Sequence, residues 1–154
     1  MSAPAPVSMD DFLAFSAEAT AFTVFELRGT GQAQAYLDKV VEVAGAPLVA
    51  QLLAVHAKAP ATGREAFLRR ELYGDPRLGP VARNVIKLWY VGIWYELPPA
   101  WVEAYGAGPA DVDTMVSGAA YAEGLLWVAI GANPPGAKAP GYGSWTGPPC
   151  IPPF

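Results

Sequence analysis

The sequence predicts a mostly α-helical fold: a compact helical domain of about five or six helices, followed by an extended C-terminal arm rich in proline, glycine and aromatic residues. Before about residue 95, apolar side chains recur at the three- and four-residue spacing of amphipathic helices. The last 22 residues contain seven prolines and four glycines, which no regular helix or central strand tolerates. We therefore divide the chain into a flexible N-terminus (1–7), a helical domain (8–132) and the arm (133–154).

The first three helices are predicted from their boundary residues. Ser8 suits the N-cap of the first helix, which we expect to end around Glu26–Gly29. Thr30 is the expected cap of the second helix, and Gly45 is a suitable C-terminal stop. Pro47 then fits the first turn of the third helix, where its missing N–H is not needed.

Two further helices follow. Thr62-Gly-Arg-Glu65 has the pattern of a capping box, in which hydroxyl and carboxylate each satisfy an unpaired amide, so it predicts the start of the fourth helix. That helix is expected to stop at Gly74. A fifth helix opens at Asp75-Pro76 or at Pro80 and ends before Pro98-Pro99.

The region from Asp111 to Ile130 allows either one more helix or a looser hairpin. Gly118 and Gly124 weaken the helical prediction because glycine disfavours helix interiors. We interpret Asp111 and Asp113 as N-terminal caps of a helix rather than as a catalytic carboxylate pair.

Composition excludes several classes of protein. The 154 residues are 53% hydrophobic and only 16% charged, which is incompatible with intrinsic disorder. A single cysteine cannot build a disulfide framework, and a net charge of −4 argues against a nucleic-acid binder. We expect no direct membrane span, since no run of about 18 apolar residues occurs. The N-terminus has no basic, apolar leader pattern, so the chain is either cytoplasmic or has lost a leader.

Charge is unevenly distributed along the chain. Residues 1–57 and 88–154 each carry a net charge of −4, whereas residues 58–87 carry +4. The basic block fits either an acidic partner or a solvated helix surface.

Residues suited to catalysis are few. His56 is the only histidine and lies in an apolar helical stretch, so we interpret it as a core or edge residue. Cys150 lies between proline pairs, and either a free thiol or a cross-link to a partner is open. The residues therefore favour a chain that is not catalytic by itself and that binds no cofactor or metal.

Three segments in a fixed order resemble a known family. They are Met9-Asp-Asp-Phe-Leu-Ala-Phe-Ser-Ala-Glu-Ala-Thr20, Val85-Ile-Lys-Leu-Trp-Tyr-Val-Gly92, and Tyr121-Ala-Glu-Gly-Leu-Leu-Trp127 followed by Pro140-Gly-Tyr-Gly-Ser-Trp-Thr-Gly-Pro-Pro149. The set resembles the small (gamma) subunit of membrane-bound FAD-dependent sugar and polyol dehydrogenases, such as the sorbitol, fructose and glucose dehydrogenases. The resemblance extends from about residue 9 to residue 149.

The resemblance implies an accessory role in an oxidoreductase complex. In that family a large flavoprotein subunit binds FAD and oxidises the sugar, and a multihaem cytochrome c subunit, which holds haem c, passes on the electrons. The small subunit has no cofactor, supports folding of the flavoprotein and carries a twin-arginine leader for export to the periplasm. This chain departs from the pattern because it lacks that leader, so a cytoplasmic location stays open.

The same reasoning selects candidate residues for a partner interface. Prolines lose little entropy on docking, tyrosine and tryptophan anchor interfaces, and glycines permit close backbone approach. The candidates are Trp89, Tyr90, Gly92, Trp127, Pro140, Gly141, Tyr142, Gly143, Trp145, Pro148 and Pro149. For the first three, packing in the core of the fifth helix is an equally good interpretation.

Two other functions stay open. The first is a stand-alone helical binding module, with an aromatic pocket near Trp89, Trp94 and Trp127 for a small apolar or sugar ligand and the arm closing over it. The second, an independent enzyme, has the least support from the residues.

Overall fold

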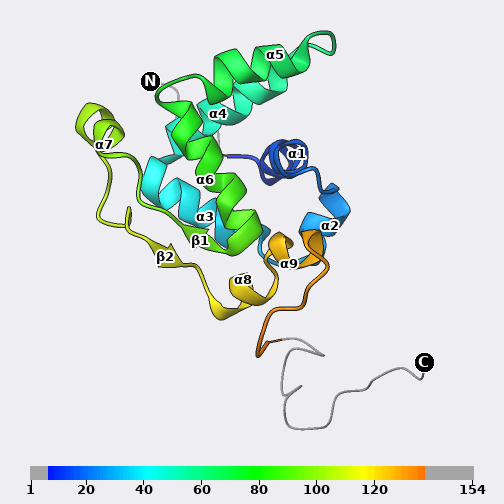
Figure 1. Ribbon diagram of the computed structural model, residues 1–154. Helices are drawn as coiled ribbons and strands as arrows, with labels where there is room; N and C mark the ends of the chain where they lie inside the picture. Colours follow the sequence, from blue (N-terminus) through cyan, green and yellow to red (C-terminus); the bar gives the residue numbers. More distant parts are fainter. Residues whose placement is uncertain (1–6, 138–154) are drawn as a thin grey trace, which may run out of the picture.

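The computed structural model describes residues 7–137 and confirms the mostly α-helical class (Figure 1). The arm falls outside this range from Lys138 onward. The elements in chain order are α1 (Met9–Thr20), α2 (Val24–Gly29), α3 (Ala33–Ala44), α4 (Ala46–Lys58), α5 (Arg64–Leu68), the π-helical turn η1 (Arg69–Tyr73), α6 (Leu78–Val91), β1 (Ile93–Trp94), α7 (Pro99–Tyr105), β2 (Thr114–Met115), α8 (Gly118–Ala122) and α9 (Leu125–Ala129).

The core lies among the four longest helices, α1, α3, α4 and α6. Each of these helices contacts the other three. Trp89 of α6 is at its centre, with 1% of its surface exposed. The indole ring stacks on Phe12 at 6.3 Å and meets Tyr36 edge-on at 4.9 Å, both measured between ring centroids. The amphipathic spacing seen in the sequence therefore buries aromatic side chains from three helices against each other.

The first predicted helix is in fact two helices. Ser8 caps α1 as expected, its hydroxyl accepting a hydrogen bond from the Asp11 N–H, but α1 ends at Thr20 because Ala21 adopts a left-handed conformation. Thr23 then forms a capping box with Glu26 that starts α2. Thr30 lies at the C-terminal end of α2, so the prediction that it caps the next helix is wrong.

The predicted capping box at Thr62 is also wrong. The helix begins one residue later than that box requires, at Arg64, which places Gly63 rather than Thr62 at the N-cap. The predicted fourth helix is continuous to Tyr73 but changes from α5 to the π-helical turn η1 at Arg69. Its end at Gly74 agrees with the sequence prediction.

α6 ends at Gly92, earlier than Pro98. Gly92 adopts φ +72°, and its N–H donates to the Leu88 carbonyl. A Cβ atom there would lie 2.7 Å from the Ala120 carbonyl oxygen, so only glycine allows α8 to pack this closely. The chain then turns into β1, which pairs antiparallel with β2 in the register Ile93 to Met115 and Trp94 to Thr114.

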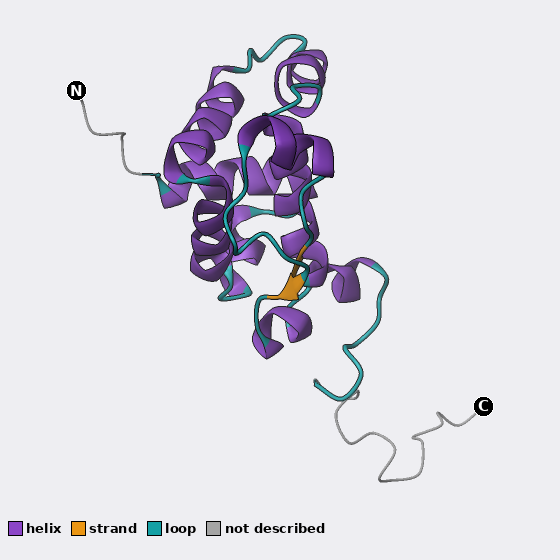
Figure 2. Ribbon diagram, turned by 90° about the vertical axis from the view of Figure 1, so that its left-hand side faces the viewer, coloured by secondary structure: helices purple, strands orange, loops and turns teal. Residues whose placement is uncertain are grey.

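The region from Asp111 to Ile130 is neither the single helix nor the hairpin expected from the sequence. It contains one strand, β2, and two helices of five residues each, α8 and α9. Figure 2 shows these short elements grouped at one end of the helical body, around the small sheet. Within residues 7–137 no single helix has the length and apolar character to cross a membrane. The helices α3 and α4 have that length and apolar character only when taken together, and they are bent by 115° relative to each other.

Candidate functional site

Segments 9–20, 85–92 and 121–127 meet around Tyr90 on α6. Its hydroxyl donates a hydrogen bond of 2.8 Å to the carbonyl oxygen of Thr20, the last residue of α1. Its ring meets Phe22 edge-on at 6.1 Å. A Cβ atom on Gly124 would lie 2.7 Å from the Tyr90 carbonyl oxygen, so the backbone before α9 rests directly on α6. Segments far apart in the sequence therefore form one packed unit.

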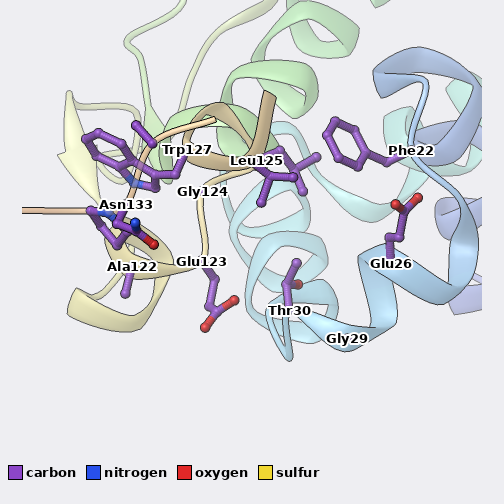
Figure 3. Close-up of a pocket in the computed structure, with 13 residues that line it drawn as sticks. Phe22, Glu26, Gly29, Thr30, Ala122, Glu123, Gly124, Leu125, Trp127 and Asn133 are labelled. Carbon is purple, nitrogen blue, oxygen red and sulfur yellow. The ribbon is translucent and has the colours of Figure 1, made fainter. Parts of the chain in front are cut away.

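A pocket of about 290 Å³ opens beside this unit, between α2 and α9. Figure 3 shows Phe22 and Glu26 on one side, Trp127 and Asn133 on the other, and Leu125 between them. The lining residues are Phe22, Glu26, Gly29, Thr30, Ala122, Glu123, Gly124, Leu125, Trp127, Val128, Ala132, Asn133 and Pro134. The volume approaches the lower end of small-molecule sites, and the lining combines apolar walls with a few polar groups.

The helices that wall the pocket also expose large apolar side chains. Phe25 on α2 has 86% of its surface exposed, Val128 on α9 has 71%, and Ile130 directly after α9 has 61%. We call these three residues, together with the pocket, the α2–α9 surface. Exposed apolar groups of this size beside a pocket are typical of an interaction site.

Two carboxylates, those of Glu26 and Glu123, line the pocket. Glu26 accepts hydrogen bonds of 2.8 Å from the backbone N–H and from the hydroxyl of Thr23, and these bonds lower the pKa of its carboxyl group. Glu26 is therefore ionised at neutral pH. Burial, and secondarily the charge of Glu123, raises the pKa of the Tyr36 hydroxyl well above its usual range.

Trp127 is held in a fixed orientation at the pocket wall. Its indole N–H donates a hydrogen bond of 2.8 Å to the Tyr121 carbonyl, and the Tyr121 ring meets the indole edge-on at 5.6 Å. The Tyr121 hydroxyl in turn donates to the Pro135 carbonyl at 3.1 Å. Of the predicted interface candidates that fall within residues 7–137, Trp127 is the one that lines the pocket.

No family model, curated protein or solved structure matches this chain.

A cluster of charged residues lies elsewhere, where α1, α4 and α5 meet. Glu18 accepts hydrogen bonds from Arg64 (2.8 Å to Nε and 2.8 Å to Nη2) and lies 2.7 Å from His56 Nε2. The Arg64 guanidinium is the main cause of a lowered pKa at Glu18, against a smaller opposing effect of burial. Arg64 also donates to the Ala59 carbonyl at 2.6 Å. His56 is 7% exposed and lies in this hydrogen-bonded cluster at the edge of the core, in agreement with the core or edge position that the sequence predicted.

The interface candidates Trp89, Tyr90 and Gly92, which lie on α6 or at its C-cap, make packing contacts, as does Trp94 of β1. Trp89 and Trp94 are buried in the core, so the predicted pocket near Trp89, Trp94 and Trp127 retains only Trp127. Tyr90 and Gly92 hold α1 and α8 against α6. The candidates Pro140, Gly141, Tyr142, Gly143, Trp145, Pro148 and Pro149, together with Cys150, lie outside the described residues.

Asp111 and Asp113 do not cap a helix, so that interpretation is corrected. Asp111 is 7% exposed and accepts hydrogen bonds from the Trp94 indole N–H at 2.8 Å and from the Leu97 N–H at 3.1 Å. Asp113 accepts from the Glu96 N–H at 2.7 Å. The two carboxylates connect the chain after β1 to the loop before β2 by hydrogen bonds.

Among the described residues, no group of three or more His, Cys, Asp or Glu side chains could hold a metal ion.

Sequence reasoning did not select the exposed apolar residues of the α2–α9 surface. Val128 and Ile130 lie in an apolar stretch that reads as a buried helix, and Phe25 continues the aromatic spacing of α1. The available signal was the pattern of a capping box at Thr23 and Glu26, which starts a second helix, so that Phe25 no longer belongs to the helix of Phe12 and Phe15.

Proposed function

We propose that this chain is a non-catalytic accessory subunit of an FAD-dependent sugar or polyol dehydrogenase. It binds and stabilises the large catalytic flavoprotein, which holds the FAD, and the complex passes electrons to a cytochrome subunit that holds haem c. The chain itself contributes no cofactor. By the same resemblance, the complex acts in the periplasm, with the cytoplasm as the alternative.

The observation that carries this proposal is the exposure of Phe25, Val128 and Ile130 on the α2–α9 surface. Burying one such side chain against a partner stabilises a complex by about 1.5–3 kcal/mol before the costs of association are counted. All three lie on, or directly after, the two helices that wall the pocket, and Val128 lines it, which suits an apolar centre of the kind found in stable interfaces.

The position of the arm supports the same contact region. Asn133 and Pro134, its first two residues, line the pocket between α2 and α9. The remaining aromatic candidates, Tyr142 and Trp145, follow within about 40 Å of extended chain at 3.3–3.6 Å per residue. The arm therefore begins at the α2–α9 surface. We propose that both the arm and this surface contact the flavoprotein.

Co-expression with a large flavoprotein subunit of an FAD-dependent sugar or polyol dehydrogenase tests the proposal. We expect the chain to raise the soluble yield and the FAD content of the flavoprotein and to co-purify with it. Phe25→Ser combined with Val128→Ser should weaken that association by at least about tenfold, because two apolar anchors are lost. Val112→Ser is the matched control, since Val112 is also exposed but lies away from the α2–α9 surface.

Removal of residues 138–154 is the second arm of this test and leaves the described body intact. We expect it to weaken the complex much more than it lowers the thermal stability of the chain. A flavoprotein with the same soluble yield and FAD content with and without this chain, and no co-purification with it, would contradict the proposed function.

A second candidate function is a small-ligand module, and the pocket beside Trp127 favours it. An aromatic wall with the carboxylate of Glu26 and the amide of Asn133 suits a sugar ring. Calorimetric titration of the chain alone with a panel of monosaccharides and polyols tests this function. Binding that Trp127→Ala abolishes while the fold is kept would favour it over the accessory role.

A further inference from the structure

The basic block 58–87 contains seven bases and three acids, and the structure shows which charges are already paired. Each acid is engaged locally. Glu65 pairs with Arg69 at 2.7 Å, Glu71 pairs with Arg70 at 2.6 Å, and Asp75 accepts hydrogen bonds from the N–H groups of Arg77 and Leu78. Arg64 is bound to Glu18 at 2.8 Å. These contacts account for three of the seven bases.

Three of the other bases belong to α6 and its N-cap. They are Arg77, Arg83 and Lys87, all exposed, and none has a carboxylate within 4.0 Å among residues 7–137. Arg83 and Lys87 are four residues apart, so they lie on the same face of the helix. We call these three residues the α6 basic face.

Two of these cations lie over tyrosine rings, and the third donates a hydrogen bond to a backbone carbonyl. The Arg77 guanidinium carbon lies 5.5 Å from the centroid of the Tyr105 ring, and Lys87 Nζ lies 4.9 Å from that of Tyr95. Arg83 Nη1 donates a hydrogen bond of 3.0 Å to the Tyr73 carbonyl. A cation–π contact restrains a long side chain but leaves its charge uncompensated. The three charges are therefore held in place and exposed to solvent.

The tyrosines are fixed by the chain that runs beside α6. Asn84 donates a hydrogen bond of 2.6 Å to the Tyr95 carbonyl, and the Trp101 indole N–H donates one of 2.9 Å to the Arg77 carbonyl. The segment from Tyr95 to Tyr105 thus follows α6 back toward its N-terminus. Figure 1 shows α6 in the foreground, with α7 on one side of the molecule and α2 on the other. None of the three residues of the α6 basic face lines the pocket of the α2–α9 surface.

We propose that the α6 basic face docks an acidic surface of the partner protein, whose Asp and Glu carboxylates pair with Arg77, Arg83 and Lys87. This inference rests on the proposed function, because it makes the flavoprotein that partner. Charge complementarity supports a protein over nucleic acid or an anionic membrane. The regions on either side of the basic block each carry a net charge of −4 and would repel a continuous layer of phosphates. Arginine and tyrosine together are also typical of protein interfaces.

The test compares two charge-neutralised pairs of the full chain. One is Arg83→Gln with Lys87→Gln; the matched control is Arg69→Gln with Arg70→Gln, which makes the same change in net charge at bases that already have carboxylate partners. The affinity of each variant for the purified flavoprotein is measured between about 50 and 300 mM salt, over which exposed charges become screened. Circular dichroism verifies that each variant is folded.

We expect Arg83→Gln with Lys87→Gln to weaken binding by at least about tenfold at the lowest salt and to flatten its salt dependence, because steering by exposed charges is lost. The control pair should stay within about threefold of the unmodified chain. Suppose that the unmodified chain binds the flavoprotein and that the variant with Arg83→Gln and Lys87→Gln binds equally well with the same salt dependence. The inference that the α6 basic face docks the flavoprotein is then overturned, and the proposed function stands. If the unmodified chain does not bind, both fall. Binding to anionic vesicles or to duplex DNA that depends on Arg83 and Lys87 would also overturn the inference.

Discussion

The helical body from α1 to α6 and the segment from Gly92 to Ala137 are stabilised in different ways. The body consists mainly of helices whose apolar faces bury large side chains around Trp89, and such packing is non-directional. The later segment has two strands of two residues and three helices of at most seven, so it depends on particular atoms. Asp111 binds two N–H groups there, and Gly92 and Gly124 allow close contacts between backbones. The first region should therefore tolerate apolar exchange, and the second should not tolerate loss of a single group.

Removal of the central aromatic side chain should have the largest effect. Trp89→Ala leaves a cavity against Phe12 and Tyr36 and should lower the free energy of unfolding by about 3–5 kcal/mol. Trp89→Phe, which keeps most of the apolar volume, is the control and should cost clearly less. Chemical denaturation of both variants measures the difference. Equal losses would show that the body also depends on specific atoms.

Loss of the buried carboxylate should rank next. Asp111→Ala leaves the Trp94 indole N–H and the Leu97 N–H without their acceptor, at a cost of about 2–3 kcal/mol. Asp113→Ala removes one exposed bond to the Glu96 N–H and should cost about 1 kcal/mol or less. Hydrogen exchange should show faster opening at Leu97 in the first variant only. Unchanged exchange at Leu97 would contradict the role given to Asp111.

A single added methyl group distinguishes conformational strain from steric contact at Gly92. Gly92→Ala and Gly31→Ala both place alanine at a positive φ, +72° and +70°, and share a penalty of about 1–2 kcal/mol. Only at Gly92 does the new Cβ meet another backbone, the Ala120 carbonyl oxygen at 2.7 Å. Thermal unfolding should therefore show a larger loss for Gly92→Ala by at least about 1 kcal/mol. Equal losses would mean that α8 moves away at little cost.

The smallest effect should come from the charged cluster and should depend on pH. Hydrogen bonding to Arg64 lowers the pKa of Glu18 in the folded state. The stability it contributes is present above the unfolded pKa of about 4.3 and is lost as the pH falls through the folded value. Glu18→Gln should cost about 1 kcal/mol or less at pH 7, since Glu18 is partly exposed, and progressively less below about pH 4.

The matched control for Glu18 is Glu65→Gln, which removes an ion pair with Arg69 that is almost fully exposed. That variant should be within about 0.5 kcal/mol of the unmodified protein at all pH values. A cost of Glu18→Gln that stays constant from pH 7 to pH 3 would show that the titration of Glu18 is not coupled to folding.

The helical fold could be predicted because its signals are local. Ser8 marks a helix start by a side-chain hydrogen bond, and Gly45 marks a helix end by its positive φ of +84°. Gly74 follows the last residue of η1, where a Cβ atom would lie 2.9 Å from the Arg69 carbonyl oxygen. The failures have the same origin. Thr62 has the sequence of a capping box but lies one residue too early, and the left-handed Ala21, which divides the first helix, has no sequence signature.

The candidate site was predictable only in part. Trp127 was selected from the sequence and does line the pocket, whereas Trp89 and Trp94, with the same chemistry, are buried. A tryptophan at helical spacing fits a core or a binding surface equally well, and only the position of neighbouring helices distinguishes them. Phe25, Val128 and Ile130 were missed for the same reason.

The sequence by itself determined the helical class, the approximate helix ends and the division of charge into acidic, basic and acidic regions. These properties follow from side-chain periodicity and residue counts, which need no knowledge of distant contacts. Tertiary structure alone decided which aromatic residues are buried, that α2 and α9 enclose a pocket, and that Arg77, Arg83 and Lys87 lack acidic partners in the described chain. Each of these depends on contacts between residues far apart in sequence, whose free energies arise only when the helices pack.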